Sequence, residues 1–292
     1  MSELPSFKEV LEKPATLSKY SEEGITRLIS EVTPLLKEEP SLVEVNASNV
    51  LFVGDTHGDL PSTISILRDF VSKGYERVIF LGDYVDRGRW QIENLNLVLT
   101  LKLEMPDKVV LLRGNHETPL ANLYYGFYET VAFRFSRRLY YYYSYLFSQL
   151  PYAALVNREF LALHGGLAEG LKTLQQIRDI PKGLIEADEQ LVLEILWNDP
   201  REGITGFKPS IRGPGIKFFG RDVFKEFMSR NNLKMLIRAH EVFYEGYRYF
   251  FDGKLLSIFS ARHYGTLINA KVALLEDEKI AVLPVKEVKV EV

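Results

Sequence analysis

Three short hydrophobic runs, each ended by a glycine and then by polar side chains, constrain this fold more than any other feature. They are 50–53, 77–81 and 108–112, followed by Gly54-Asp55-Thr56-His57-Gly58, Gly82-Asp83-Tyr84-Val85-Asp86-Arg87-Gly88 and Gly114-Asn115-His116-Glu117. Continuous apolar runs of this length are typical of strands buried on both faces of a parallel sheet. Positions 54, 82 and 114 are 28 and 32 residues apart, close to the roughly 30 residues of a strand-helix-strand unit. We therefore predict that these polar residues share the C-terminal edge of one sheet, where ligands bind in open α/β folds.

The second half of the chain repeats the pattern of a strand followed by polar residues. Hydrophobic runs at 159–163, 234–237 and 255–259 lead into His164, His240 and His263. With His57 and His116, all 5 histidines of the chain therefore follow a predicted strand. A single histidine is more often a structural residue than a ligand, but five in equivalent positions favour a shared site.

Helical periodicity predicts helices in the connections between the strands. We predict one helix from Ser21 with Pro34 inside it, one that Asp59-Leu60-Pro61 opens and Gly74 ends, and one from about Trp90 to Met105. The buried stripe of the second helix is expected at Leu60, Ile64, Leu67 and Val71. The chain is predicted to form one domain over residues 1–292, with residues 1–45 as an N-terminal helical segment packed on it.

Composition excludes several classes of function. The net charge is −3 with a pI near 6.0, so no global positive field attracts nucleic acid or an anionic membrane. The absence of cysteine excludes disulfides, thiolate nucleophiles and cysteine-bound zinc. No apolar run approaches the roughly 18 residues of a membrane span, and a cytoplasmic location is expected. Basic residues beside tyrosines at 137–143 can stack on single-stranded nucleic acid, but adjacent helical residues point in different directions, so packing is favoured.

The polar residues at the predicted sheet edge suit a pair of metal ions. Asp55 and His57 are two positions apart and can reach one cation, while the carboxylate of Asp83 can bridge two. Three further residues, Asn115, His164 and His240, would complete a second site. Oxygen and imidazole ligands without thiolate suit manganese, or alternatively iron or zinc, better than calcium. Two ions about 3.5–4 Å apart would activate a bridging water and bind a phosphate.

Phosphoryl transfer also needs positive charge from side chains and an acid for the leaving group. Arg87 and Arg212 offer planar guanidinium groups to phosphate oxygens. His116, next to the predicted ligand Asn115, can act as the acid, with Asp86 orienting its other ring nitrogen.

These motifs resemble the signature blocks of the phosphoprotein phosphatase family of metal-dependent serine/threonine protein phosphatases, whose relatives include calcineurin. The resemblance continues through His164-Gly165-Gly166, Leu196-Trp197-Asn198-Asp199-Pro200, Arg212-Gly213, Phe219-Gly220 and Arg238-Ala239-His240. It covers roughly residues 23–283. The early blocks occur in other metallophosphoesterases, whereas the complete set is specific. The cysteine-free chain looks most like archaeal members.

The resemblance implies an α/β metallophosphoesterase sandwich of two mixed sheets flanked by helices, with a dinuclear metal site at the C-terminal edge of the strands. It implies that one metal is bound by Asp55, His57 and Asp83, and the other by Asp83, Asn115, His164 and His240. It further implies His116 as general acid, Asp86 as its partner, and Arg87, Asn115, Arg212 and Tyr264 around the phosphate. A hydroxide bridging two metal ions would then hydrolyse phosphoserine and phosphothreonine. Phosphorylated proteins are the expected partners, with no nucleic acid and no membrane among them.

Two other functions compete with this interpretation. A dinucleotide polyphosphate hydrolase would share the early blocks, but is not expected to combine the 197–220 region with a Ser-Ala-x-x-Tyr loop. A catalytically silent phosphoprotein-binding scaffold would be expected to lack His116, Asp83 or an arginine at the phosphate, and all of these are present.

One block departs from the family. Many eukaryotic members read Ser-Ala-Pro-Asn-Tyr-Cys where this chain reads Ser260-Ala261-Arg262-His263-Tyr264-Gly265. Loss of the proline is expected to loosen this loop, and the charge of Arg262 to favour acidic or bulkier substrates, including phosphotyrosine. The alternative is that Arg262 and His263 point into solvent without effect.

Overall fold

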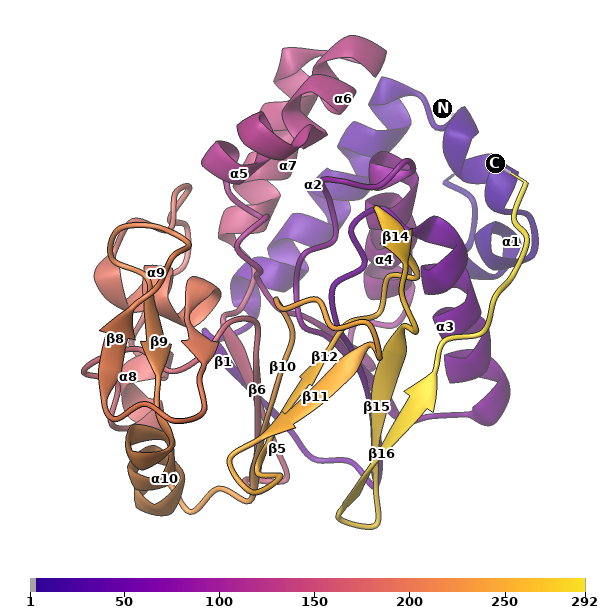
Figure 1. Cartoon of the computed structure of the whole chain (residues 1–292). Helices are drawn as coiled ribbons and strands as arrows, with labels where there is room; N and C mark the ends of the chain where they lie inside the picture. Colours follow the sequence, from indigo (N-terminus) through magenta and orange to yellow (C-terminus); the bar gives the residue numbers. More distant parts are fainter. Residues whose placement is uncertain (1–3, 292) are drawn as a thin grey trace.

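Two mixed β-sheets, packed face to face, form the centre of the computed structural model, which describes residues 4–291 (Figure 1). The five-stranded sheet has the order β16 (Lys279–Pro284), β15 (Lys271–Glu276), β2 (Asn49–Val53), β3 (Arg77–Phe80), β4 (Val109–Leu111). The six-stranded sheet has the order β1 (Leu42–Val45), β5 (Ala153–Val156), β6 (Phe160–Leu163), β10 (Met235–Arg238), β12 (Leu255–Ile258), β11 (Tyr247–Phe250). The predicted sandwich of two mixed sheets is confirmed.

The three hydrophobic runs at 50–53, 77–81 and 108–112 are neighbouring parallel strands, as predicted. β2 pairs with β3 and β3 with β4, so that Val53, Phe80 and Leu111 lie side by side at one end of the sheet. The polar loops therefore leave the same edge. On the other side of β2 runs β15, which is antiparallel and comes from more than 200 residues later in the chain.

The same edge is shared by the second sheet. There, β10 is parallel to both β6 and β12, and an isolated parallel bridge joins Asp55 to Phe259 just beyond β2 and β12. At this junction a Cβ on Gly54 would lie 2.4 Å from the carbonyl oxygen of Ile258. Glycine is thus needed at position 54 because the two sheets approach each other too closely there for a side chain.

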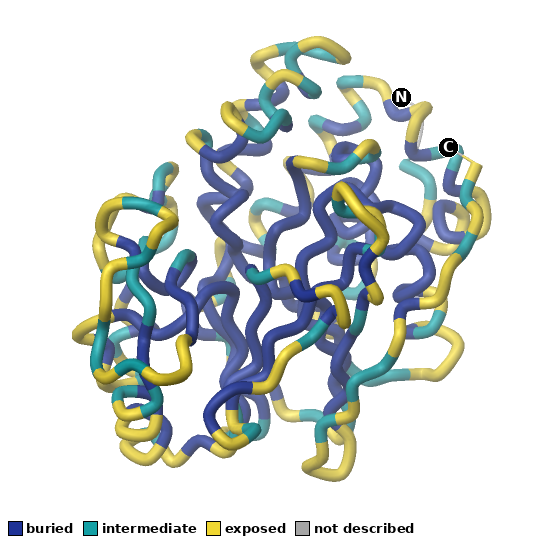
Figure 2. Tube along the Cα trace, viewed as in Figure 1, coloured by how far each residue is buried: buried dark blue, intermediate teal, exposed yellow. Residues whose placement is uncertain are grey.

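Helices cover the outer face of each sheet. The five-stranded sheet shares its core with α1 (Phe7–Glu12), α2 (Glu22–Glu38), α3 (Leu60–Lys73), α4 (Gln91–Glu104), α6 (Phe127–Arg134) and α7 (Arg137–Ser148). The six-stranded sheet shares its core with α8 (Leu174–Arg178), α9 (Gln190–Trp197) and α10 (Arg221–Arg230). A third core lies between the two sheets, and Figure 2 shows this centre as a continuous buried region. The inner face of each sheet therefore packs on the other sheet, and helices cover the outer face. The accessible part of the sandwich is the row of strand ends from which the polar loops leave.

Local sequence signals place most helix ends correctly. The side chain of Ser21 caps α2, and Gly74, with φ 67°, ends α3. The predicted stripe of α3 was wrong at Val71, which is 49% exposed, whereas Phe70 is buried. Helix α3 packs against both the sheet and α4, so its buried surface is wider than a single stripe.

Several segments differ from simple sequence expectations. Residues 42–45, placed in the N-terminal helical segment, form the edge strand β1, which pairs with β5. The glycine- and proline-rich loop at 203–220 contains β8 (Phe207–Pro209) and β9 (Lys217–Phe219), which form a small sheet with β7 (Asp199–Pro200).

Two tyrosines of the aromatic run, Tyr140 and Tyr143, are buried in the core, which supports the packing interpretation. Within residues 4–291, the helices are too short or too polar to span a bilayer.

Candidate active site

The predicted site residues come from separate strand ends and meet in one place. Asp55 and His57 follow β2; Asp83, Asp86 and Arg87 follow β3; Asn115 and His116 follow β4; His164 follows β6 and His240 follows β10. The six expected metal ligands are all buried, with exposed fractions between 0% and 7%. Charged and polar groups are buried together at this density only where they satisfy one another or bind an ion.

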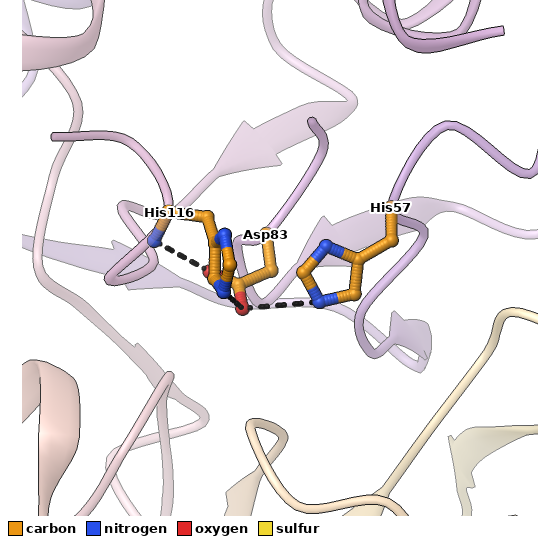
Figure 3. A group of neighbouring side chains, drawn as sticks. All are labelled: His57, Asp83 and His116. Carbon is orange, nitrogen blue, oxygen red and sulfur yellow. Dashed lines mark hydrogen bonds and ion pairs between the residues drawn. The ribbon is translucent and has the colours of Figure 1, made fainter. Parts of the chain in front are cut away.

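Asp83 lies at the centre of this cluster (Figure 3). One carboxylate oxygen is 3.4 Å from Nε2 of His57, and the other accepts a hydrogen bond of 3.0 Å from the backbone N–H of His116. That second oxygen is also 3.3 Å from Nε2 of His164. Asp83 has a positive φ of 56°, and a Cβ on Gly114 would lie 2.2 Å from its Oδ1. The glycine before Asn115 is therefore required for the carboxylate to sit between the two groups of residues.

The rings of His57 and His164 present lone pairs rather than N–H groups to the centre. Nδ1 of His57 lies 2.7 Å from the carbonyl oxygen of Val85, and Nδ1 of His164 lies 2.8 Å from that of Leu81. A carbonyl can only accept, so each Nδ1 carries the proton and each Nε2 of a neutral ring keeps a lone pair. Burial lowers the pKa of His164 to about 3, which keeps its ring neutral. The Nε2 lone pairs of these two rings thus face carboxylate oxygens.

This arrangement fits metal ions. Nε2 of His164 faces Oδ1 of Asn115 at 2.8 Å and Nδ1 of His240 at 3.1 Å. Burial and the neighbouring Asp55 carboxylate raise the pKa of Asp83 well above its usual value, because carboxylates are buried close together here. Among the described residues, Nδ2 of Asn115 and Nε2 of His240 are buried without a hydrogen-bond partner. Electron pairs that converge in this way are stabilised by cations, and the donor set of imidazole, carboxylate and amide suits borderline divalent ions.

Within the described part of the chain, two groups of three side chains have ligand atoms within 4.8 Å of one another. They are His57, Asp83 and His116, and Asp83, His164 and His240. The groups share Asp83, the residue expected to bridge two ions. Asp55 lies beside the first group, with Oδ2 3.6 Å from Nε2 of His57, and its Oδ1 accepts from the backbone N–H of His240. The ligand atoms thus form two adjacent clusters and not one.

His116 differs from the other histidines in its partner. Its Nδ1 lies 2.7 Å from Oδ2 of Asp86, a carboxylate instead of a carbonyl, which favours a charged imidazolium. Asp86 itself accepts hydrogen bonds from the backbone N–H of Phe127 at 2.8 Å and from Nδ2 of Asn122 at 3.1 Å. This pair has the geometry of a general acid and the residue that orients it.

The protonation of this pair depends on what else is bound. Burial raises the pKa of Asp86 to about 6. Burial, together with the nearby His57, lowers the pKa of His116 well below its usual value. A phosphate dianion close to the ring would oppose that shift, because nearby negative charge favours the protonated imidazole. His116 is therefore suited to hold a proton when an anionic substrate is present.

Both predicted arginines are oriented by residues that the sequence did not single out. The guanidinium of Arg87 lies 3.8 Å from the ring centre of Tyr125, a cation–π contact. Nε of Arg212 donates to Oδ2 of Asp199 at 2.6 Å, and the other oxygen of Asp199 accepts from the buried Arg238 at 2.9 Å. Asp199 thereby couples Arg212 to the end of β10. Its position in the quoted Asn198-Asp199-Pro200 block was the available signal, whereas nothing in the sequence distinguishes Tyr125 from other tyrosines.

Glu117 is a second residue whose importance only the structure reveals. It is fully buried and accepts backbone hydrogen bonds from Asp83 at 2.8 Å, Tyr84 at 2.9 Å and Gly114 at 2.9 Å. These bonds tie the loop after β3 to the loop after β4. Burial raises the pKa of Glu117 to about 7, and the three N–H donors act against that shift. Glu117 thus holds together the two loops that supply Asp83 and His116.

In the loop at 260–265, which departs from the family, Arg262 matches neither expectation. The ring of Tyr264 lies 5.0 Å from that of His57, so it does overhang the cluster. Arg262, however, points neither toward the site nor into solvent. Its side chain is 18% exposed, and Nη1 donates to the carbonyl oxygen of Val285 at 3.1 Å. The expectation that its charge faces substrate was wrong, because a carbonyl at the end of β16 accepts the guanidinium. The ring of His263 is half exposed, 3.2 Å from Asp59.

Comparisons with known proteins agree with this geometry. Residues 48–244 match the protein family described as Calcineurin-like phosphoesterase. A protein serine/threonine phosphatase from Saccharomyces cerevisiae, with similarity to human phosphatase PP5, superposes with a TM-score of 0.83 at 29% identity, over 92% of this chain and 90% of that chain. A cold-active protein-tyrosine phosphatase from a psychrophilic Shewanella species superposes with a TM-score of 0.62 at 17% identity, over 86% of this chain and 84% of that chain. The second likeness is one of fold.

Proposed function

This chain belongs to the calcineurin-like phosphoesterase family, and we propose that within it the protein is a metal-dependent serine/threonine-protein phosphatase. The observation that carries this proposal is the likeness to the yeast serine/threonine phosphatase, which extends over 92% of the chain at 29% identity. It is supported by the two buried groups of candidate metal ligands that share Asp83. The substrates would be phosphorylated serine and threonine side chains of proteins.

The residues that would hold the metal ions are those whose lone pairs converge. Asp55, His57 and Asp83 would hold one ion, and Asp83, Asn115, His164 and His240 the other, with manganese proposed ahead of iron or zinc. Two bound divalent ions would supply a water acidic enough to lose a proton and attack phosphorus, and positive charge for the phosphate oxygens. The protein's own contribution is to hold these ligands rigidly, through the carbonyls of Val85 and Leu81 and the carboxylate of Glu117.

The remaining residues would act on the phosphate and on the leaving group. Arg87 and Arg212 would bind phosphate oxygens and stabilise the charge that develops on them. Tyr264, above His57, would restrict how the substrate enters. Nε2 of His116 would donate its proton to the departing serine or threonine oxygen, while Asp86 holds the ring by its Nδ1.

Parallel assays of three substrates test the proposal. Protein loaded with manganese is given a phosphoserine peptide, the same peptide with phosphotyrosine, and diadenosine tetraphosphate, and product is measured as phosphate or nucleotide. We expect the phosphoserine peptide to be hydrolysed with the highest kcat/KM. Protein carrying His116→Asn, purified in the same way, controls for contaminating phosphatases. Preferential cleavage of diadenosine tetraphosphate, or no release of phosphate from the phosphoserine peptide, would refute the proposed function.

A further inference from the structure

The loop that carries Tyr264 is a very short hairpin. Strands β13 (His263–Tyr264) and β14 (Thr266–Leu267) pair only through His263 with Leu267 and Tyr264 with Thr266. An isolated two-stranded hairpin is at best marginally stable in water, and both residues of β14 are exposed. Besides the packing of its own ring, the position of Tyr264 over His57 therefore depends on contacts at the base of the hairpin, where the N–H of Ile268 also donates to the carbonyl oxygen of Arg262 at 2.8 Å.

One anchor of that base is the buried carboxylate of Asp59. Its Oδ2 accepts the backbone N–H of Arg262 at 2.7 Å and that of His263 at 3.0 Å, as well as the hydroxyl of Ser62 at 2.6 Å. Asp59 stands at the start of α3, two residues beyond His57. This anchor fixes the backbone on the side of the hairpin that faces the metal-ligand loop.

The second anchor is the side chain of Arg262. Its Nη1 donates to the carbonyl oxygen of Val285 at 3.1 Å, and its Nη2 lies 3.6 Å from the carboxylate of Glu287. Val285 is itself immobilised, because it is buried and its N–H donates to the carbonyl of Ala270 at 2.9 Å. The arginine thus ties the hairpin to the segment that follows β16.

The segment after β16 is attached to the body independently of the hairpin. Figure 1 shows it running beside α3 toward α1, and Lys286 forms an ion pair of 3.0 Å with Asp69 of α3. The hairpin is therefore held between two fixed supports, Asp59 on one side and Val285 on the other. The guanidinium is the side chain that reaches the second support.

We propose that Arg262 is a positioning residue for substrate binding, which holds the hairpin against Val285 so that Tyr264 stays above the phosphate site. This inference rests on the proposed phosphatase function. Tyr264 has ring contacts with His57 at 5.0 Å and Phe259 at 5.1 Å, and its ring centre is 6.0 Å from the guanidinium of Arg87. Movement of the hairpin base would withdraw the ring from all three. Arg262 therefore acts through Tyr264 and not by touching substrate.

Kinetics of Arg262→Ala test the proposal. KM for the phosphoserine peptide is expected to rise at least about 10-fold, the lower bound for losing one hydrogen bond from a charged group, whereas kcat on a small aryl phosphate stays within about 2-fold of wild type. Arg262→Lys should give an intermediate KM, because a single ammonium replaces the two guanidinium nitrogens that separately face Val285 and Glu287. In a Tyr264→Ala background, Arg262→Ala should have no further effect on KM.

A matched control is available on α3. Nη2 of Arg68 also donates to a distant carbonyl, that of Leu11, at 3.0 Å, but it has no contact with the hairpin. Arg68→Ala should leave KM unchanged. If Arg262→Ala also leaves KM unchanged, or if its effect multiplies with that of Tyr264→Ala, Arg262 does not act through Tyr264 and the inference is wrong.

Hydrogen exchange separates this inference from the proposed function, because it needs neither metal nor turnover. Backbone amides in residues 260–268 should exchange faster in Arg262→Ala than in wild type, with no change there in Arg68→Ala. Unaltered exchange in Arg262→Ala overturns the anchor, whatever the protein hydrolyses. Faster exchange in a protein that fails to cleave the phosphoserine peptide would leave the anchor standing and refute the substrate class.

Discussion

Asp86→Asn isolates the proton-donating function of His116 without removing the histidine. Asp86 presents one oxygen to the backbone N–H of Phe127 and the other to Nδ1 of His116 at 2.7 Å and to the amide of Asn122 at 3.1 Å. An amide in its place keeps a single acceptor. If that acceptor stays with Phe127, a donor faces the ring of His116, and the charged imidazolium loses its stabilising partner.

The expected loss can be worked out from this contact. A hydrogen bond to a charged group contributes about 1.5–3 kcal/mol, and at about 1.36 kcal/mol per tenfold change in rate this gives a loss of about 10- to 160-fold in kcat. Complete removal of general acid catalysis costs about 10²- to 10⁴-fold. Asp86→Asn should therefore be slower than wild type but no slower than His116→Asn.

The assay compares two leaving groups. Because burial raises the pKa of Asp86 to about 6, measurements at about pH 8 keep the wild-type carboxylate charged. On a phosphoserine peptide the full loss in kcat is expected, since an alkoxide needs a proton as it departs. On an activated aryl phosphate, whose leaving group needs less help, the loss should be several-fold smaller. Asp69→Asn, which removes a surface carboxylate paired with Lys73 and Lys286, is the control.

Two results would refute the assignment of His116 as acid. One is an equal loss of kcat on both substrates, which would mean that Asp86 supports the fold or the metal ligands and not proton transfer. The other is wild-type kcat for His116→Asn on the phosphoserine peptide. Metal content should be measured for each variant by elemental analysis, so that a loss of metal is not mistaken for a loss of the acid.

Four further outcomes are expected. Chelation should abolish activity and added manganese restore it, and full turnover of protein shown to be metal-free would contradict the two-metal site. Asp83→Asn should lose bound metal, as seen by elemental analysis, because its two oxygens face both ligand groups. Arg212→Ala should reduce kcat/KM and weaken inhibition by inorganic phosphate, whereas Arg178→Ala, a surface arginine paired with Glu44, should change neither. Phe127→Ala should lower the free energy of unfolding by about 3–5 kcal/mol, because Phe127 is fully buried; a smaller change in a denaturant titration would indicate that its neighbours fill the space.

Local sequence was sufficient for the strands that lead into the candidate site, for three helices, and for the convergence of the polar residues that follow those strands. A strand buried on both faces appears in the sequence as an unbroken apolar run, and a parallel sheet brings the ends of such strands to one edge. For this reason Asp55, Asp83 and His116 could be placed together from spacing alone, and the structure does bring them together. Caps such as Ser21 and Gly74 are equally local, because the capping contacts lie within a few residues.

Only the tertiary structure decided which distant segments meet. Strand β15 pairs with β2, Asp199 accepts a hydrogen bond from Arg212, and Tyr125 lies under Arg87. No periodic pattern in the sequence indicates these contacts. Arg262 is the clearest case. Its sequence neighbours suggested a charge at the substrate, whereas the carbonyl that accepts its hydrogen bond belongs to Val285. A side chain's partner depends on which acceptor the fold brings within about 3 Å, and for long-range contacts that is determined by the packing of the whole chain.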